Sequence, residues 1–441
     1  MANTYLTRTP SSASNRRTFT ISTWVKLANL DGNTTIFSAW YADSTVGHFV
    51  FRGSSDKFGW SQWSNDSYST RLFRDVNGWY HVVLAVDTTQ ATASNRIKMY
   101  INGVQETSFS VGAVYPSQNE ELPVNNNNIQ TVGSNNYSSN QNFFDGSMSH
   151  FHFIDGTAYD ASAFGETDAT TGEWVGKTSP SVTYGTNGFF ILKDGNGITD
   201  QSGEGNDFTL GGGTLTDLKD NPDNVFATMN PLHFGTGSTS NTTLTNGNNT
   251  FTSTQGGSPY PYYFSTLGNT KGKYYAEFKY SAGVSGDSAT VGIGSVPDGY
   301  SGNNSLSWSY YANGNVYNGG SSSSYGNAWN VGSILGVAMD LDNSKLYFSI
   351  NGTWQNSGVP TSGSTGTGAK SITANTLYLF EAGDAGGNQP TIQCNFGNGY
   401  FGTTAITTNS GNGYAGAEGA SKFNYTVPSG YSALNTKGLN L

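Results

Sequence analysis

Residues 345–354 read KLYFSINGTW, and this stretch decides the fold class. Apolar residues such as Leu346 and Phe348 alternate with more polar ones, and a period of two places each set on one face of a β-strand. Asn351 and Gly352 follow the alternation, and both residue types accept the positive φ that a two-residue type I′ turn requires. The stretch therefore predicts a β-hairpin that belongs to a half-buried antiparallel sheet.

The same pattern occurs earlier in the chain, where residues 98–105 read KMYINGVQ. Ile97, Met99 and Ile101 alternate with polar neighbours and are followed by a second Asn-Gly pair. The chain is therefore either one domain repeated or two different domains that use the same turn. The strands on either side of each hairpin distinguish these alternatives.

The composition favours an all-β protein. Of the 441 residues, 11% are charged, 14% are aromatic and 58 are glycine. Few charges and many small polar residues suit short strands joined by polar turns and are poor material for helices. The length is sufficient for two or three domains, each with its own core.

The charge distribution excludes several function classes. The formal net charge is −10 and no run of Lys and Arg is present, so we expect no nucleic-acid partner. No apolar run has the length needed to cross a bilayer, so we expect no membrane insertion. The opening residues MANTYLTRTPSS lack the basic and apolar segments of a signal peptide, so we expect the chain either to stay inside the cell that makes it or to leave by a route other than secretion, such as lysis.

Residues 1–165 carry closely spaced strand signals, which are typical of a β-sandwich. The segments TFTISTWVK (18–26), GWYHVVLAVD (78–87), KMYINGVQ (98–105) and GSMSHFHFIDGTAY (146–159) follow in that order. The order resembles the laminin-G-like or concanavalin-A-like lectin sandwich, in which an early Trp-containing strand, a WxHV-type strand, an Asn-Gly hairpin and a closing strand succeed one another.

Residues 256–402 show a different series of strands. GKYYAEFKY (272–280), ATVGIGSV (289–296), SILGVAMDLDNSKLYFSINGTW (333–354), LYLFEAGDAGG (377–387) and IQCNFG (392–397) occur in order. This order resembles the SPRY domain. The two Asn-Gly hairpins are therefore one turn chemistry used in two related sandwiches rather than a duplication.

The predicted architecture is all-β, with two jelly-roll-like antiparallel β-sandwiches. Residues 166–255 are rich in Gly and Asn, and we expect a connecting segment there, with GFFILK as one strand. Residues 403–441 are expected to form a C-terminal extension.

Nearly the whole chain also resembles structural proteins of tailed bacteriophages, especially marine ones. The resemblance is carried by five segments and by the SPRY-like region that lies before the last of them: FIDGTAYDASAFGETDATTGEWVGK (153–177), YGTNGFF (184–190), DQSGEGNDF (200–208), DNPDNVFATMNPL (220–232) and FNYTVPSGYSALNTKGL (423–439). The resemblance implies a virion surface protein, either a head decoration or head-fibre protein or a tail-associated subunit. The partners that it implies are other virion proteins, further copies of the chain in a homo-oligomer, and a host glycan or protein.

We expect no catalytic residues and therefore no enzyme. Concanavalin-like glycoside hydrolases align their acids as E-x-D-x-x-E on one strand. The nearest approach here is Glu166, Asp168 and Glu173 in GETDATTGE, where the last spacing is too long and a loop is expected. A polysaccharide-degrading tail enzyme is one alternative function, and a cell-encoded carbohydrate-binding adhesin is another.

The histidines and the single cysteine have structural interpretations. His150 and His152 lie two residues apart in SHFHF, a spacing that suits a metal pair, but no third ligand is near in sequence. We therefore interpret them as a polar, solvent-facing side of a strand. Cys394 shares a strand face with apolar residues and is interpreted as a buried thiol.

Two sets of residues are candidates for binding. The acidic stretch DGNGITDQSGEGND offers calcium-type oxygen ligands from Asp194, Asn196, Asp200 and Asp207; the alternative is an acidic turn without a cofactor. Sugars and protein partners are often held by Trp and Tyr side chains, which combine apolar area with a polar tip. The candidates of this kind, in or beside predicted turns, are Trp40, Tyr41, Trp60, Trp63, Tyr68, Tyr300, Trp308, Tyr310, Tyr311 and Tyr317. Because Tyr310 and Tyr311 are adjacent, we expect at least one of them to be exposed or in an interface.

Overall fold

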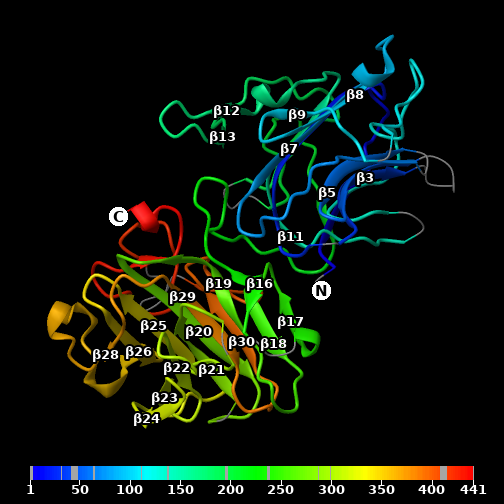
Figure 1. Cartoon of the computed structure of the whole chain (residues 1–441). Coiled ribbons are helices and arrows are strands. Elements are labelled where there is room, and N and C mark those ends of the chain that lie inside the picture. Colours follow the sequence, from blue (N-terminus) through cyan, green and yellow to red (C-terminus); the bar gives the residue numbers. More distant parts are fainter. Residues whose placement is uncertain are drawn as a thin grey trace. The chain divides into compact units, whose positions relative to one another are not determined.

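The computed structural model describes residues 3–30, 32–40, 48–62, 65–110, 112–136, 139–193, 197–235, 239–286, 288–297, 299–407 and 415–440. The chain divides into two compact units, Met1–Asp217 (unit 1) and Leu218–Leu441 (unit 2). Both units consist of sheets whose strands pair antiparallel, apart from one short parallel pair in unit 2, so the predicted all-β class is confirmed (Figure 1). No helix within the described ranges is long and apolar enough to cross a membrane.

The first sheet of unit 1 has the strand order β15-β1-β10-β3-β4-β5-β6. Its strands are β1 (Tyr5–Arg8), β3 (Thr34–Trp40), β4 (His48–Ser54), β5 (Lys57–Gln62), β6 (Asn65–Tyr68), β10 (Gln130–Val132) and β15 (Thr209–Gly212). The second sheet has the order β14-β11-β2-β7-β8-β9. Its strands are β2 (Thr18–Leu27), β7 (Tyr80–Asp87), β8 (Ile97–Ile101), β9 (Val104–Glu106), β11 (Gly146–Asp155) and β14 (Phe189–Ile191).

The core of unit 1 lies between these two sheets. Phe37 on β3 stacks on Phe153 of β11 with ring centroids 5.8 Å apart. Val82, Leu84 and Val86, which alternate along β7, are fully buried in the same cluster. The period of two therefore places the apolar face of each strand against the opposite sheet, as in a sandwich.

The first sheet of unit 2 has the order β16-β19-β29-β21-β22-β23-β24. Its strands are β16 (Met229–Phe234), β19 (Tyr262–Asn269), β21 (Ala289–Gly294), β22 (Ser307–Tyr311), β23 (Asn315–Asn318), β24 (Ser321–Ser324) and β29 (Tyr378–Asp384). The second sheet runs β17-β18-β30-β20-β25-β26-β27, with β28 beside β26 and β33 parallel to β20. Its strands are β17 (Thr242–Thr245), β18 (Thr250–Ser253), β20 (Lys273–Ala282), β25 (Ile334–Asp340), β26 (Lys345–Ile350), β27 (Thr353–Trp354), β28 (Lys370–Ser371), β30 (Thr391–Asn395) and β33 (Ser432–Ala433).

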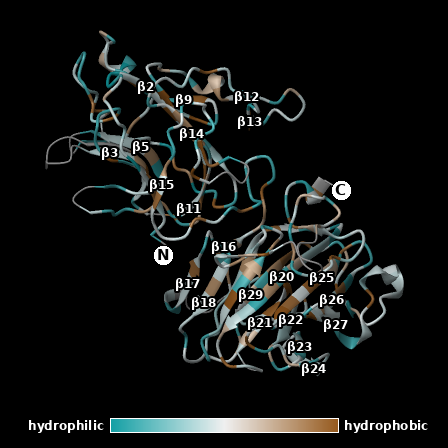
Figure 2. Ribbon diagram, turned by 180° about the vertical axis from the view of Figure 1, so that it is seen from behind, coloured by the Kyte–Doolittle hydropathy of each residue, from teal (hydrophilic) through white to brown (hydrophobic). Residues whose placement is uncertain are grey.

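The core of unit 2 again lies between its sheets. It contains alternate residues of β20, such as Tyr274, Ala276 and Phe278, together with Phe380 from the opposite sheet. Cys394 is fully buried in this cluster. Figure 2 shows hydrophobic residues concentrated on strands such as β20 and β25, with hydrophilic residues in the loops that join them.

Two short hairpins and several 3-10 turns complete the described chain. The hairpins are β12 (Gly165–Thr167) with β13 (Trp174–Gly176) and β31 (Tyr400–Phe401) with β32 (Thr404–Ala405). The 3-10 turns are η1 (Ala93–Asn95), η2 (Ala161–Ala163), η3 (Thr239–Asn241), η4 (Gln355–Ser357), η5 (Pro360–Thr365) and η6 (Gly438–Asn440).

Both Asn-Gly pairs form the predicted turns. Asn102 and Gly103 have φ of 48° and 78°, and Asn351 and Gly352 have the same values. Both central residues are thus in the left-handed region, and the strands pair directly on either side, with Ile350 opposite Thr353. Two-residue type I′ hairpins are therefore confirmed at both sites.

The prediction of half-burial holds for one hairpin and is wrong for the other. β8 alternates between buried and half-buried residues, as expected for a sheet with one covered face. Along β26, however, Tyr347 is fully buried as well as Leu346 and Phe348. A further layer of chain covers the outer face of this sheet.

That layer is the C-terminal part of the chain. Phe423, Val427 and Tyr431 are buried against Tyr275 of β20 and Tyr347 of β26. We call residues 415–434 the C-terminal cover. It explains why the residues of β26 that were expected to face solvent are buried.

Residues 166–255, expected to connect the sandwiches, contribute strands to both units. β14 and β15 belong to the sheets of unit 1, and β16, β17 and β18 belong to those of unit 2. The boundary between the units falls after Asp217. Strand pairing fixes these Gly- and Asn-rich segments within the sandwiches.

Candidate binding site

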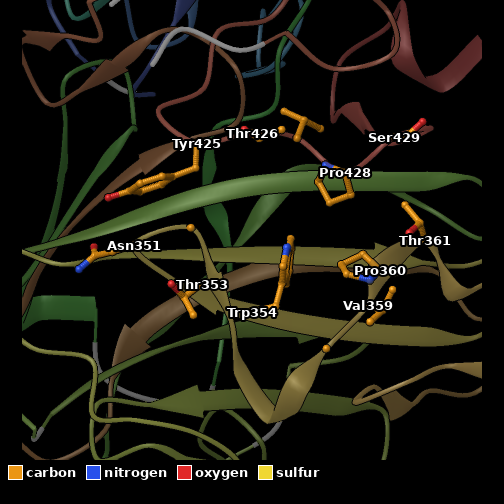
Figure 3. A pocket seen from close by; sticks show the side chains of 13 residues that line it. Asn351, Thr353, Trp354, Val359, Pro360, Thr361, Tyr425, Thr426, Pro428 and Ser429 are labelled. Atoms are coloured by element: carbon orange, nitrogen blue, oxygen red, sulfur yellow. The ribbon is translucent and has the colours of Figure 1, made fainter. Parts of the chain in front are cut away.

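A pocket of about 570 Å³ lies in unit 2, beside the turn of the hairpin KLYFSINGTW. It is lined by the hairpin and the chain that follows it, and by the C-terminal cover: Asn351, Gly352, Thr353, Trp354, Gly358, Val359, Pro360, Thr361, Tyr425, Thr426, Val427, Pro428 and Ser429. Figure 3 shows the side chain of Trp354 rising between Tyr425 on one side and Pro360 on the other. The pocket therefore forms where two segments distant in sequence meet.

The position of Trp354 follows from the hairpin. Trp354 ends β27 and lies opposite Ser349 of β26. Its ring packs edge-on against Tyr275 and Tyr347, with centroid distances of 6.3 and 6.4 Å. One side of the indole is thereby fixed against the sheet, and the residue remains partly exposed to the pocket.

The opposite wall is held by a buried carboxylate. Glu277 of β20 is fully buried, and its oxygens accept the backbone N–H groups of Asn424 at 2.7 Å and Tyr425 at 2.8 Å. They also accept the Tyr275 hydroxyl at 3.2 Å and the Asn395 side-chain amide at 3.4 Å. Burial raises the pKa of Glu277 to about 7, although the four donors favour the charged form.

Two further contacts fix the pocket. The Tyr431 hydroxyl donates to the Pro360 carbonyl at 3.0 Å, which ties the C-terminal cover to the chain after β27. Gly352 lies under the Tyr425 ring, because a Cβ added to Gly352 would be 2.7 Å from Tyr425 Cδ1. The walls are therefore positioned before any ligand arrives.

The aromatic candidates of unit 1 have mainly structural positions. Trp40 is buried and its Nε1–H donates to Asn135 Oδ1 at 2.8 Å. Trp60 is fully buried in the core, and its Nε1–H donates to the Val114 carbonyl. Tyr68 ends β6 and is half-buried. Tyr41 and Trp63 lie outside the described residues.

The aromatic candidates of unit 2 separate onto two faces of β22 and β23. Tyr310 is fully buried in the core between the sheets, and Trp308 packs against the same core. Tyr311, Tyr317 and Tyr300 lie on the other side, where Tyr311 and Tyr317 stack with centroids 3.8 Å apart.

Tyr310 and Tyr311 are both buried, so the expectation that one of them is exposed is wrong. They do point to opposite faces of β22, but both faces are covered. On the outer face Tyr311 packs on Tyr317 and donates its hydroxyl to the Ser301 carbonyl at 2.8 Å. This leaves Tyr300, Trp308 and Tyr317 as the partly exposed members of the set.

The acidic stretch forms a hydrogen-bonded turn. Asp200 accepts the backbone N–H groups of Phe190, Ser202 and Asn206, and Asp207 accepts that of Asp200 at 2.7 Å. The hydrogen bonds give these two carboxylates a role in closing the turn. Asp194 and Asn196 lie outside the described residues, and the described part of the chain contains no group of three metal-ligating side chains.

The histidine pair does not share a solvent-facing side, because a register shift separates Ser149 from His152. His150 has a φ of 50° within this irregularity. His152 is buried, stacks on Phe190 at 3.9 Å and contacts the Tyr184 hydroxyl through Nδ1 at 2.8 Å. The interpretation of His152 as solvent-facing is therefore wrong.

The segment GETDATTGE is a hairpin rather than a loop, with β12 and β13 on either side of the turn. Asp168 accepts the backbone N–H groups of Thr170 and Thr171 at 2.8 and 2.7 Å. These hydrogen bonds lower the pKa of Asp168 and give its carboxylate the role of closing the turn. On the other strand of this hairpin, Trp174 packs over Gly103, where an added Cβ would be 2.5 Å from the indole ring.

Sequence reasoning did not identify the pocket of unit 2. Trp354 lies in the stretch that indicated the fold, and Tyr425 lies in the segment expected to be an extension. A signal for it is the combination of an Asn-Gly-Thr-Trp turn with the aromatic- and proline-containing sequence FNYTVPSGY. Only the docking of this second segment reveals that the two aromatic residues line one pocket.

Family comparisons match one domain in each unit. Residues 2–163 match the concanavalin A-like lectin/glucanases superfamily, and residues 273–369 match the SPRY domain. The chain contains a concanavalin A-like domain and a SPRY domain. These two resemblances, inferred from the order of the strands, are thus confirmed, and binding or adhesion is the general role that such domains suggest.

Solved structures similar to the chain align with about two fifths of it. The SPRY domain of human HERC1 is 18% identical, with a TM-score of 0.30, and the alignment covers 38% of this chain and 96% of that one. The stonustoxin structure is 19% identical, with a TM-score of 0.29, and the alignment covers 38% of this chain and 27% of that one. No curated protein matches the chain.

Proposed function

We propose that this protein is a non-enzymatic attachment protein on the surface of a tailed bacteriophage particle. Its two sandwiches would hold binding surfaces toward host glycans or host proteins. The observation that carries the attachment role is the preformed pocket of the SPRY-containing unit, whose walls are fixed by Glu277 and Tyr431. A concanavalin A-like domain in the other unit supports the same role.

The virion location is supported by the sequence resemblance to phage structural proteins. That resemblance includes segments outside both family matches, among them residues 184–190, 220–232 and 423–439. Residues 423–434 of the last segment belong to the C-terminal cover, and residues 425–429 line one wall of the pocket. The proposal includes other virion proteins and further copies of the chain as partners, and assembly in the host cytoplasm before lysis.

The non-enzymatic part of the proposal is supported by the positions of the candidate catalytic groups. Asp168 closes a turn. His81 contacts Ser22 Oγ at 2.9 Å, but its other nitrogen accepts the Trp174 indole N–H rather than contacting a carboxylate. Burial lowers the pKa of His81 to about 3, so this buried Ser–His pair lacks the acid that would stabilise an imidazolium.

Immunogold labelling of intact particles from the source lysate tests the location. Label over the head supports a decoration or head-fibre protein, and label at the tail supports a host-recognition subunit. Absence of label from every particle would overturn the virion proposal in favour of a cell-encoded adhesin.

The non-enzymatic proposal has its own test. Purified protein is incubated with host capsular polysaccharide, and reducing ends are measured over time. Release above that of a heat-inactivated sample would show a polysaccharide-degrading enzyme.

A further inference from the structure

We propose that the pocket beside Trp354 binds a neutral pyranose sugar, which stacks on Trp354 and contacts the other lining residues, Tyr425 among them. The inference rests on the proposed attachment function and adds the ligand class and the site. It assigns sugar binding to the SPRY-containing unit rather than to the lectin-like one.

The polar groups of the pocket make the first argument. The indole N–H of Trp354, the Tyr425 hydroxyl and the hydroxyls of Thr353, Thr361, Thr426 and Ser429 all belong to lining residues. None of these six groups forms a hydrogen bond with any residue that the structure describes. Several buried aromatic residues of this unit, by contrast, use their polar groups internally, as in Tyr310, Tyr311 and Trp329. The pocket thus gathers polar groups that are available to a ligand.

The kind of polar group distinguishes a sugar from a peptide. Each hydroxyl both donates and accepts, and so does each hydroxyl of a sugar. A polyproline-type peptide presents carbonyl acceptors and no backbone N–H donors, so it would leave the acceptor sites of these hydroxyls unused. Because four of the six available groups are aliphatic hydroxyls, the lining matches a sugar better than a proline-rich segment.

Among the described residues, the lining of the pocket carries no charged side chain, so an acidic or basic ligand would find no opposite charge there. The residues that form the pocket are aromatic, aliphatic, hydroxyl or amide residues, and no Asp, Glu, Lys or Arg is among these described residues. Glu277, which holds the pocket wall, is fully buried and uses its oxygens to bind the backbone N–H groups of residues 424 and 425. A neutral ligand is therefore expected.

The shape of the pocket supports stacking. The Trp354 ring supplies apolar surface to the pocket, and Tyr425, Val359, Pro360 and Pro428 add further apolar surface around it (Figure 3). The C–H face of a pyranose ring packs on such surfaces while its hydroxyls point to the polar rim. The volume of about 570 Å³ falls within the range of about 300–1,000 Å³ usual for small-molecule sites.

The walls of the pocket are also held by internal contacts, an arrangement that reduces the entropy lost on binding. The backbone at Asn424 and Tyr425 is held by Glu277, and Pro360 is held by Tyr431. Trp354 is held by its edge contacts with Tyr275 and Tyr347. The ligand therefore meets walls that are already in place.

The test is saturation-transfer NMR and titration of the full-length protein with four probes. These are the methyl glycosides of glucose, galactose, mannose and N-acetylglucosamine, with a decaproline peptide as the comparison ligand. We expect at least one glycoside to bind and Trp354→Phe to weaken it about 10-fold, since the smaller ring loses stacking area and the indole N–H. Thr426→Ala, which removes one hydroxyl from an exposed residue, is expected to weaken binding about 3-fold.

Trp308→Phe is the matched control, because Trp308 is also half-buried in unit 2 but lies outside the pocket. Its binding is expected to stay within about 2-fold of wild type. Glycoside binding that survives Trp354→Phe but is lost in Trp308→Phe would overturn the pocket assignment and leave the attachment function standing. If decaproline binds and none of the four glycosides does, the proposal that the ligand is a sugar is overturned. The same holds if neither decaproline nor any glycoside binds. The attachment function has a separate test, in which antibody against the protein is added to particles that carry it and adsorption to host cells is measured. Adsorption that the antibody leaves unchanged would show that the attachment function is wrong.

Discussion

Replacement of Phe423 by Ala tests whether the C-terminal cover is an integral layer of unit 2. Phe423 is fully buried, and its ring meets that of Tyr275 edge-on at 5.1 Å. Removing a buried Phe side chain costs about 3–5 kcal/mol, which combines lost transfer free energy with the cavity that remains. Because the cover lies on one side of the sheet and can relax toward it, we expect the lower part of this range, about 3 kcal/mol.

The measurement is the free energy of unfolding of the full chain in urea. Hydrogen exchange of peptides from β20 and β26 is read at each urea concentration, so that the transition of unit 2 is followed by itself. Phe234→Ala is the matched control, because Phe234 is 38% exposed in the same unit and its loss is expected to cost about 1 kcal/mol or less. If Phe423→Ala costs no more than the control, the cover does not protect the outer face of β20, and the account of the pocket wall is wrong.

Three further predictions follow from individual contacts. Gly352→Ala is expected to destabilise unit 2 by about 1 kcal/mol more than Gly332→Ala in urea denaturation; both glycines have positive φ, but only Gly352 lies against a ring, that of Tyr425. Equal effects would contradict the close approach of the Tyr425 ring. Because burial raises the pKa of Glu277 from 4.5 to about 7, its contribution to stability is complete below pH 4.5 and is lost as pH rises to 7. The difference in unfolding free energy between wild type and Glu277→Gln should therefore fall by about 3 kcal/mol between pH 4.5 and 8, and a constant difference would refute the raised pKa. Calcium at millimolar concentration is expected to leave the Tm unchanged, since Asp200 already accepts several hydrogen bonds; a rise of several degrees, abolished by EDTA, would restore the calcium interpretation of this turn.

Much of the strand pattern could be predicted, because the signals for it are local. The two Asn-Gly turns adopt the conformation expected of their residue types, with φ of 48° and 78° at both sites. The strand expected at residues 146–155 is β11, which spans Gly146–Asp155. These features depend on neighbours in sequence, and period-two alternation reports them directly.

The binding residues were harder to predict, because an aromatic residue near a turn gives no information about what covers it. Trp60 and Tyr310 were candidates for exposed sites, yet both are fully buried and use their polar atoms within the protein. Trp354, whose indole N–H has no partner among the described residues, was not a candidate. The difference lies in contacts made by distant segments.

By itself, the sequence determined an all-β protein with two sandwiches of the concanavalin A-like and SPRY types, because hydrophobic alternation and turn chemistry act over a few residues. Only the tertiary structure decided that residues 166–255 pair into the sheets and that the C-terminal cover docks on β20. Gly- and Asn-rich segments have the same composition whether they connect domains or pack on them. The deciding contacts, such as the hydrogen bond between Glu277 and the backbone N–H of Tyr425, join residues 148 positions apart. Such contacts form only when the folded sheet places a buried acceptor next to the backbone of the docking segment. A local sequence pattern carries no information about that placement.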